Sequence, residues 1–197
     1  MPADMVTVDL WSLAEDVVVE HDERRDQVVL KSRWGVDCLE GPGSAVREAL
    51  RRMELGPMLL ANASDAQGDL YAVMLPVLSR LSHLVVRTLG VDDLRGPLLS
   101  VFPVAKNARF KLVWLPDGRR VRMPRQVVVT TVESGLVLDV AGGAHRVVLH
   151  RPEAALVAAM LAWPVTPDKV SAGLPLPPEL TEDVIRYLAA AGMAAPV

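Results

Sequence analysis

The sequence predicts an α+β fold made of two tandem modules, each with a three-stranded antiparallel sheet followed by three helices. The same order of patterns occurs twice in 197 residues, with short β-branched runs ahead of amphipathic helices in each half. Apolar residues make up 51% of the chain, which is enough for two cores in modules of about 100 residues. Three strands backed by three helices is the outline of a winged helix, a fold that usually binds a ligand and rarely performs chemistry.

The first module is expected to span residues 1–104, beginning with a weakly patterned arm over 1–16. In the clearest strand, Val28 and Leu30 alternate with Val29 and Lys31, as in a strand with one buried face. Strands are predicted at 17–20, 27–34 and 36–40. Helices are predicted at 43–53 and 69–81, with a short helix at 58–63 between them.

The longer helix of this module carries apolar residues at spacings of three and four, with Pro76 expected to kink or shorten it. Asp69 is predicted to cap its first turn. The apolar runs at 84–89 and 98–104 predict a hairpin around 90–97, which is the expected place for a wing.

A basic, proline-bearing connector is expected at 105–124, and the second module at 125–197. Its strands are predicted at 126–132, 136–140 and 146–150. Its helices are predicted at 152–162, 167–174 and 178–191. Pro152, Pro167 and Pro178 each stand near the first turn of one of these helices, where a missing N–H costs little.

The net charge of −3 conceals an asymmetry between the halves. Residues 1–98 hold 10 basic and 16 acidic side chains, and residues 99–197 hold 11 basic and 8 acidic ones. Most of the basic excess lies between Lys106 and Arg125. We define the last four arginines of this stretch as the basic patch: Arg119, Arg120, Arg122 and Arg125.

Catalytic and metal-binding patterns are absent from the sequence. The four histidines are scattered, without acidic or cysteine neighbours at ligand spacing, so no metal site is expected. Cys38 is the single cysteine and is expected to be a small buried apolar group. We therefore expect a protein that is not an enzyme and holds no cofactor of its own.

The single cysteine also fits a reducing compartment, and no secretory signal or run of about 18 apolar residues is present. A cytoplasmic protein that does not bind membranes is expected.

Winged helices bind DNA or peptides, and the charge of the third helices favours peptides. Helix 69–81 carries Arg80 against Asp69, and helix 178–191 carries Arg186 against three carboxylates. A helix of that charge would be repelled by phosphates, so no nucleic-acid partner is expected. The open edge of a short sheet can instead accept an extended peptide as a further strand.

The predicted peptide site in each module is its third strand together with the facing wall of its third helix. An acidic peptide would gain from the basic patch and from arginines at 47, 51 and 52. The predicted peptide-binding residues of the first module are Val36, Cys38, Leu39, Leu70, Met74, Leu78 and Leu81. Those of the second module are Arg146, Val148, His150, Val184, Arg186 and Tyr187. Each apolar member has the alternative of being a core residue, and a peptide-facing side chain must be partly exposed.

Several segments resemble the region ahead of the catalytic domain in SagB-type peptide dehydrogenases. They are Ser32-Arg33-Trp34-Gly35, Gly41-Pro42, the helix 46–50, the run Gly96-Pro97-Leu98-Leu99-Ser100-Val101, residues 121–139 and 145–152, and the ending Tyr187–Met193. The resemblance covers nearly the whole chain and consists of distributed patterning without a catalytic motif.

The resemblance implies a recognition role. Those enzymes use FMN to oxidise azolines to azoles in ribosomally made peptides, and their front portion consists of winged-helix modules related to the leader-binding chaperone PqqD. In such modules the leader lies between the third strand and the third helix. Because Val197 ends the sequence where a flavin domain would begin, FMN is expected on a partner subunit; a stand-alone recognition protein and a fragment are the alternatives.

The expected function is therefore leader recognition, with the precursor peptide and a flavin-dependent azoline dehydrogenase as partners. Two other classes stay open: a structural dimerisation subunit without leader affinity, and a winged-helix transcription regulator. A homo-oligomer is an alternative to a monomer.

Overall fold

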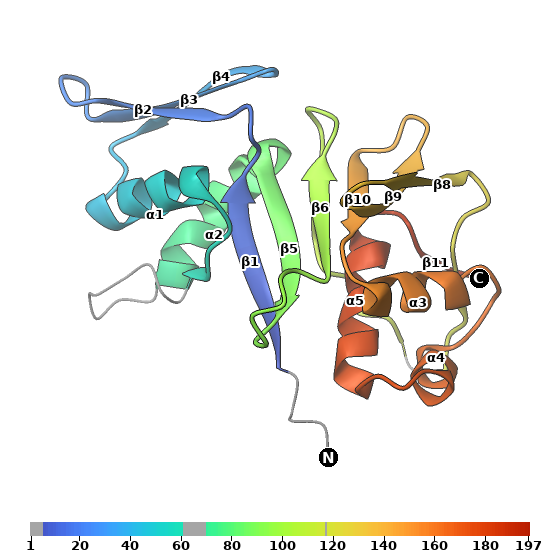
Figure 1. The fold of residues 1–197 in the computed structure, drawn as a ribbon. Helices are drawn as coiled ribbons and strands as arrows, with labels where there is room; N and C mark the ends of the chain where they lie inside the picture. The colour runs from blue at the N-terminus through green and yellow to red at the C-terminus, as the bar shows by residue number, and fades with distance from the viewer. Residues whose placement is uncertain (1–5, 61–69, 117) are drawn as a thin grey trace.

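The computed structural model describes residues 6–60, 70–116 and 118–197, and these form a mixed α+β fold (Figure 1). The described chain contains five α-helices and three antiparallel sheets. In each half three antiparallel strands precede the helices, as the sequence pattern predicts.

The three-stranded sheet of the first half has the order β2 (Val18–Asp22), β3 (Gln27–Ser32), β4 (Gly35–Glu40). Gly35 follows the two-residue turn between β3 and β4 with φ +115°, a conformation that side chains rarely adopt. The helices α1 (Ser44–Leu55) and α2 (Leu70–Arg80) pack with this sheet around the first core. Large members of that core include Leu30, Leu50, Met53, Met74 and Leu84.

A six-stranded sheet runs through the middle of the molecule in the order β1-β5-β6-β10-β9-β8 (Figure 1). Its strands are β1 (Thr7–Leu13), β5 (Val85–Val91), β6 (Leu99–Pro103), β8 (Val127–Val132), β9 (Gly135–Val140) and β10 (His145–Leu149). A short 3₁₀ helix, η2 (Ser82–Leu84), leads into β5.

The second core lies between the β5–β6–β10–β9 part of this sheet and three helices, α3 (Pro152–Met160), α4 (Pro167–Gly173) and α5 (Pro178–Ala190). The C-terminal strand β11 (Ala195–Pro196) pairs with β7 (Val121–Arg122) in a small separate sheet. None of the helices in the described ranges has the length and apolar character needed to cross a bilayer.

The predicted N-terminal arm is instead a strand. β1 pairs with β5 along its whole length, from Thr7 opposite Val91 to Leu13 opposite Val85. The sequence pattern did not predict this strand, because the carboxylate of Asp9 in its middle interrupts the apolar alternation. In the structure Asp9 accepts hydrogen bonds from Arg87 of β5 and from the Tyr187 hydroxyl of α5.

The hairpin predicted around 90–97 exists as β5–β6, but it lies inside the six-stranded sheet, where β1 and β10 flank it. The predicted short helix 58–63 lies partly outside the described residues, as does Asp69. Met58 forms an isolated antiparallel bridge to Trp11. Pro76 stays within α2, which runs on to Arg80.

The two cores divide the chain near the middle of β5, which differs from the expected boundaries at 104 and 125. Val85 belongs to the first core, whereas Leu89, Leu99 and Val101 belong to the second. β5 and β6 therefore complete the second half, so the halves share one continuous sheet.

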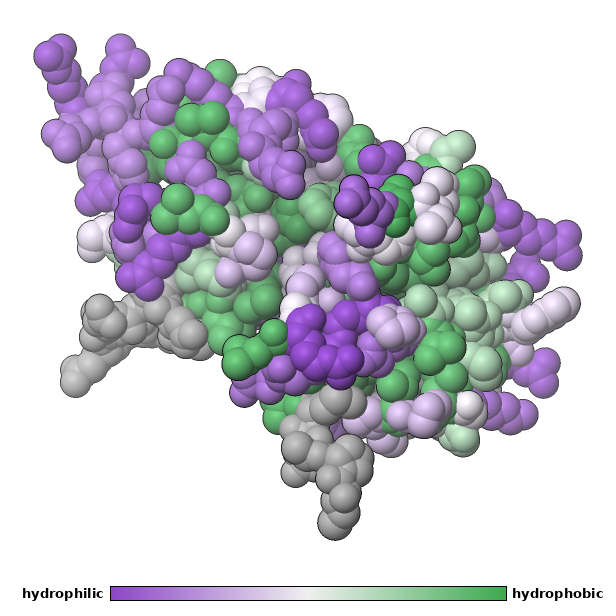
Figure 2. Space-filling view, in the orientation of Figure 1, coloured by the Kyte–Doolittle hydropathy of each residue, from purple (hydrophilic) through white to green (hydrophobic). Residues whose placement is uncertain are grey.

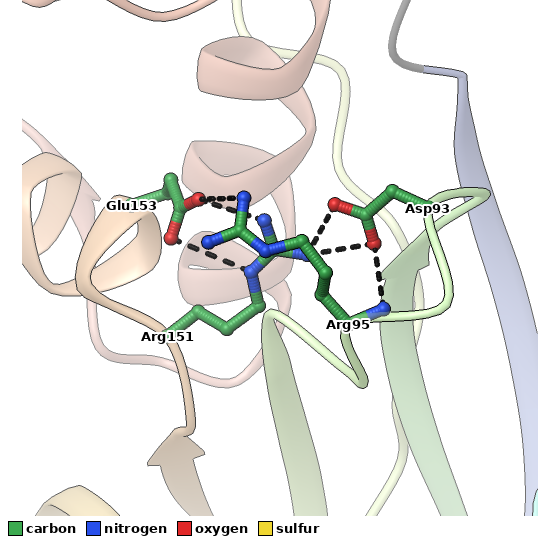
Figure 3. Close-up of polar contacts among 4 residues, drawn as sticks. All are labelled: Asp93, Arg95, Arg151 and Glu153. Carbon is green, nitrogen blue, oxygen red and sulfur yellow. Dashed lines mark hydrogen bonds and ion pairs between the residues drawn. The ribbon is translucent and has the colours of Figure 1, made fainter.

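A buried ion-pair cluster fastens the β5–β6 turn to the start of α3 (Figure 3). Arg151 donates to both carboxylate oxygens of Asp93, at 3.0 and 2.9 Å, and to Glu153 at 2.7 Å. Arg95 lies beside Glu153 at 3.9 Å, and its backbone N–H donates to Asp93. Because Arg151 is buried, its charge depends on both carboxylates for compensation.

Candidate functional site: the open edge of strand β4

β4 is an edge strand with a single strand partner. The sheet order β2-β3-β4 leaves its second side without a strand in the described part of the chain. Such an edge presents N–H and C=O groups that can pair with another extended chain. This is the feature that peptide addition to a sheet requires.

The direction of the free main-chain groups follows from one contact. Arg80 of α2 donates a hydrogen bond to the Cys38 carbonyl oxygen at 2.8 Å, so this carbonyl points away from β3. Because successive residues of an antiparallel strand alternate between the two sides, Val36 and Glu40 share the orientation of Cys38. Three residues of β4 thus direct main-chain groups outward, one of them held by Arg80.

The end of α2 is fastened beside β4. Besides the Arg80 contact, buried His83 of η2 lies 3.0 Å from Asp37 through its Nε2 atom. Residues three and four positions apart share a helix face, so Val77 and Val73 lie on the same side of α2 as Arg80. Val73 is 56% exposed and Val77 is half-buried, so apolar surface continues along α2 from the turn that holds Arg80.

α2 is apolar around most of its circumference. Leu70, Met74 and Leu78 are buried, while Tyr71, Val73 and Leu75 are exposed. An ordinary surface helix has polar residues on the face turned away from the core. The exposed apolar side of α2 is therefore the part of the first half that needs an explanation by binding.

In the predicted site of the first module, part of the strand is exposed and stays a prediction, whereas the predicted helix wall is buried. Val36 is 62% exposed and Cys38 is half-buried, whereas Leu39 points into the core. The predicted wall residues Leu70, Met74, Leu78 and Leu81 are all buried core residues. The three-and-four spacing identified the core stripe, and the exposed residues between its members are the ones that a peptide could reach.

The predicted edge in the second module is closed, so that part of the prediction is wrong. β10 is an interior strand, paired with β9 on one side and β6 on the other. Arg146 forms an ion pair with Asp139 at 2.9 Å, Val148 is buried, and His150 lies 3.0 Å from the Ser100 hydroxyl. Burial lowers the pKa of His150.

The facing helix α5 offers no alternative surface. Val184 and Tyr187 are buried, and half-buried Arg186 forms an ion pair with Asp183 at 3.1 Å. Strand β6 occupies the position at which a peptide would have to pair with β10. The sequence pattern assigned the β6 residues to the first module and did not indicate that they would lie beside β10.

The basic patch lies far from β4. Its members Arg119, Arg120, Arg122 and Arg125 lie on β7 and in the segments around it, on the opposite side of the molecule from β4 in Figure 1. The arginines of α1 face other carboxylates: Arg47 pairs with Asp26, and Arg51 and Arg52 pair with Glu48. These contacts lower the pKa of Glu48 to about 2. The charges expected to attract an acidic peptide are thus not gathered at the edge.

A cavity of about 620 Å³ opens on the other side of α2, between that helix, β5 and residues 109–112. At its base the Arg87 guanidinium stacks on the Trp11 ring at 3.3 Å and lies 5.0 Å from the Phe110 ring centre. Burial, with the adjacent Asp9 carboxylate, raises the pKa of Tyr187, so this hydroxyl stays protonated and donates to Asp9. The network joins β1, β5 and α5 and is structural.

Groups of three or more histidine, cysteine or carboxylate side chains able to hold a metal are not found among the described residues. Comparison of the sequence with models of known protein families and with curated proteins finds no match. The candidate site therefore depends on the geometry of β4 and α2.

Proposed function

We propose that this chain recognises the leader of a ribosomally made precursor peptide and presents it to a flavin-dependent azoline dehydrogenase as the non-catalytic subunit. The observation that carries the proposal is the open edge of β4, with the end of α2 held beside it through Arg80. In this proposal the halves are related winged-helix modules, of which only the first keeps its peptide edge.

The leader adds to β4 as a fourth strand of the β2–β3–β4 sheet. The outward main-chain groups of Val36, Cys38 and Glu40 pair with it, and Arg80 gives up the Cys38 carbonyl. Val36 and the Val73–Val77 side of α2 then contact apolar side chains of the peptide. Main-chain pairing supplies part of the affinity, and these side-chain contacts distinguish one leader from another.

A titration of fluorescently labelled precursor peptide into the purified chain tests the proposal, with the leaderless core peptide as control. The full precursor is expected to bind and the core peptide is not. Equal binding of both peptides, or binding of neither, would remove leader recognition.

Two proline variants on opposite edges of the same sheet locate the contact. Cys38→Pro removes an outward N–H from β4, a change that an edge strand tolerates, and is expected to weaken binding. His21→Pro does the same on β2, where the neighbouring Val19 N–H donates outward to Glu54 at 2.9 Å. The β2 variant is expected to bind the precursor like the wild type. A loss of affinity in this variant alone would mean that the peptide pairs with β2 and would contradict the assignment to β4.

A further inference from the structure

β8 is the most exposed strand in the described part of the chain. It ends the six-stranded sheet, and all of its residues except half-buried Val127 are exposed. Val128 is 59% and Val129 53% exposed, although they point to opposite faces. The helices that cover the second core therefore do not extend over β8, and Figure 2 shows apolar surface at the upper right, in the region of β8 and β9 in Figure 1.

The sequence of this strand is Val-Val-Val-Thr-Thr-Val, which is uncharged, free of proline and rich in β-branched residues. Natural proteins usually protect an exposed edge with lysine, proline or a bulge. The opposite end of the same sheet is partly covered, because Met58 exchanges two backbone hydrogen bonds with Trp11 of β1, at 2.9 and 3.0 Å. Among the described residues, the outward side of β8 has a backbone contact of this kind at its first residue alone, where the Val127 N–H donates to Pro124.

The outward main-chain groups of β8 belong to Val127, Val129 and Thr131. The Val127 N–H donates to the Pro124 carbonyl at 3.1 Å, so it does not pair with β9 on its other side. Alternation along the strand gives Val129 and Thr131 the same outward orientation. Val129 lies at the centre of this set of three.

The charges flanking β8 are arranged symmetrically about Val129. Exposed Arg125 precedes it by four residues, and exposed Glu133 follows it by four. Arg125 lies in the turn before β8 and Glu133 in the turn after it, so an antiparallel pair of two β8 strands with Val129 opposite Val129 brings Arg125 of one copy and Glu133 of the other to the same end of the pair. Val127 then lies opposite Thr131, so that its carbonyl faces the Thr131 N–H of the other copy, while its own N–H has to leave the Pro124 carbonyl to pair.

We propose that two copies of this chain associate through β8 in this register, forming a two-fold symmetric dimer with one sheet continuous across both. A two-fold axis requires a surface complementary to itself, and the Val129-centred arrangement of strand and charges meets that requirement. The interface is small, so association is expected in the micromolar range rather than as a permanent dimer.

Sedimentation velocity of the full chain over a concentration series tests the dimer, with circular dichroism verifying that each variant is folded. The wild type is expected to dimerise by roughly 100 μM. Glu133→Arg places arginine opposite arginine at both ends and is expected to weaken association roughly tenfold. Arg125→Glu is expected to do the same.

The double variant Arg125→Glu with Glu133→Arg restores opposite charges in reversed order and is expected to recover the wild-type dimer. A monomeric wild type would overturn the proposal, and so would a dimer that both single variants leave unchanged. The Cys38→Pro variant of β4 is expected to dimerise normally, so failure of the dimer and failure of leader binding are separate results.

Discussion

Buried charges in this protein are held by more than one partner each. Arg151 contacts Asp93 and Glu153 from opposite sides, and Arg87 combines an ion pair to Asp9 with stacking on Trp11. Removing one partner of such a group leaves an uncompensated charge in a region of low dielectric constant. Single substitutions at these positions should therefore cost more than the loss of one exposed ion pair.

Arg151→Met is expected to lower the free energy of unfolding more than the loss of one exposed ion pair does, because it leaves Asp93 and Glu153 without their shared cation. Urea denaturation followed by circular dichroism measures this change. Arg146→Met is the matched control: Arg146 is exposed, and the expected loss is below about 1 kcal/mol. Equal losses in the two variants would contradict the role given to Arg151.

The same cluster predicts a dependence of stability on acid. Hydrogen bonding to Arg151 lowers the pKa of Glu153 below its ordinary value of 4.5, although burial opposes the shift. For Asp93 burial also raises the pKa, but hydrogen bonds from the Arg95 N–H and Arg151 lower it further, to below 3.8. A depressed carboxyl pKa stabilises the fold above its unfolded value and loses that effect as pH falls through the folded value.

The urea midpoint is therefore expected to fall as the pH drops below about 4.5, and the Glu153→Gln variant should show a shallower fall. Unfolding curves at pH 7 and at several values between about pH 5 and 3 measure both slopes. A variant slope as steep as that of the wild type would mean that other carboxylates dominate acid unfolding.

At the scale of elements, α2 presents two apolar faces with different roles. One face completes the first core, and the other, on the Arg80 side, exposes Val73, whereas Tyr71 and Leu75 line the cavity on the far side of the helix. If the exposed face contacts a leader peptide, polar substitution there should change binding and leave the fold intact.

Val73→Asp is expected to weaken binding of the labelled precursor about tenfold or more, because a carboxylate would be desolvated against the apolar peptide. Thermal unfolding should change little, since the side chain is exposed. Leu55→Asp is the control, because Leu55 is 77% exposed at the end of α1. Unchanged affinity in Val73→Asp would remove α2 from the binding surface.

The elements that the sequence predicts well are those whose pattern is local. The strands of both three-stranded units and the helices α1, α3, α4 and α5 lie within a few residues of their expected ranges, since alternation, proline and glycine mark them directly. β1 was missed because Asp9 breaks the alternation, and its partners Arg87 and Tyr187 lie far away in sequence. The closing of β10 by β6 was missed for the same reason, because strand order depends on long-range pairing.

For the candidate site too, the sequence predicts the local elements but not which of their residues are exposed. The sequence identifies β4 and α2, but periodicity alone selects the apolar stripe that fills the core. Only burial shows that Val73 lies outside that stripe while Met74 lies within it.

At the scale of the whole molecule, the halves are interlocked. β5 contributes to both cores, and the turn between β3 and β4 contacts the second half through Arg33, which donates to the Pro103 carbonyl at 2.9 Å. Lys106 donates in return to the Trp34 carbonyl at 3.1 Å. We therefore expect the chain to unfold as one cooperative unit.

A fragment of residues 105–197 tests this interlocking. It lacks β5 and β6, which supply Leu89, Leu99 and Val101 to the second core, and β6 is also the strand that pairs with β10. The fragment is expected to be unfolded or aggregated, as judged by amide dispersion in an NMR spectrum. A well-dispersed spectrum would mean that the second half folds as an independent domain.

The hydrogen bond from Arg80 to the Cys38 carbonyl has a consequence for discrimination among ligands. A peptide that pairs with β4 at Cys38 replaces the Arg80 hydrogen bond with one of its own. Main-chain pairing therefore contributes less binding free energy here than it would at an edge whose carbonyl groups are all unpaired. A random unfolded polypeptide, which brings only its backbone, therefore gains little by displacing the guanidinium. If β4 binds a leader peptide, its retention at this edge therefore depends on the side chains of that peptide.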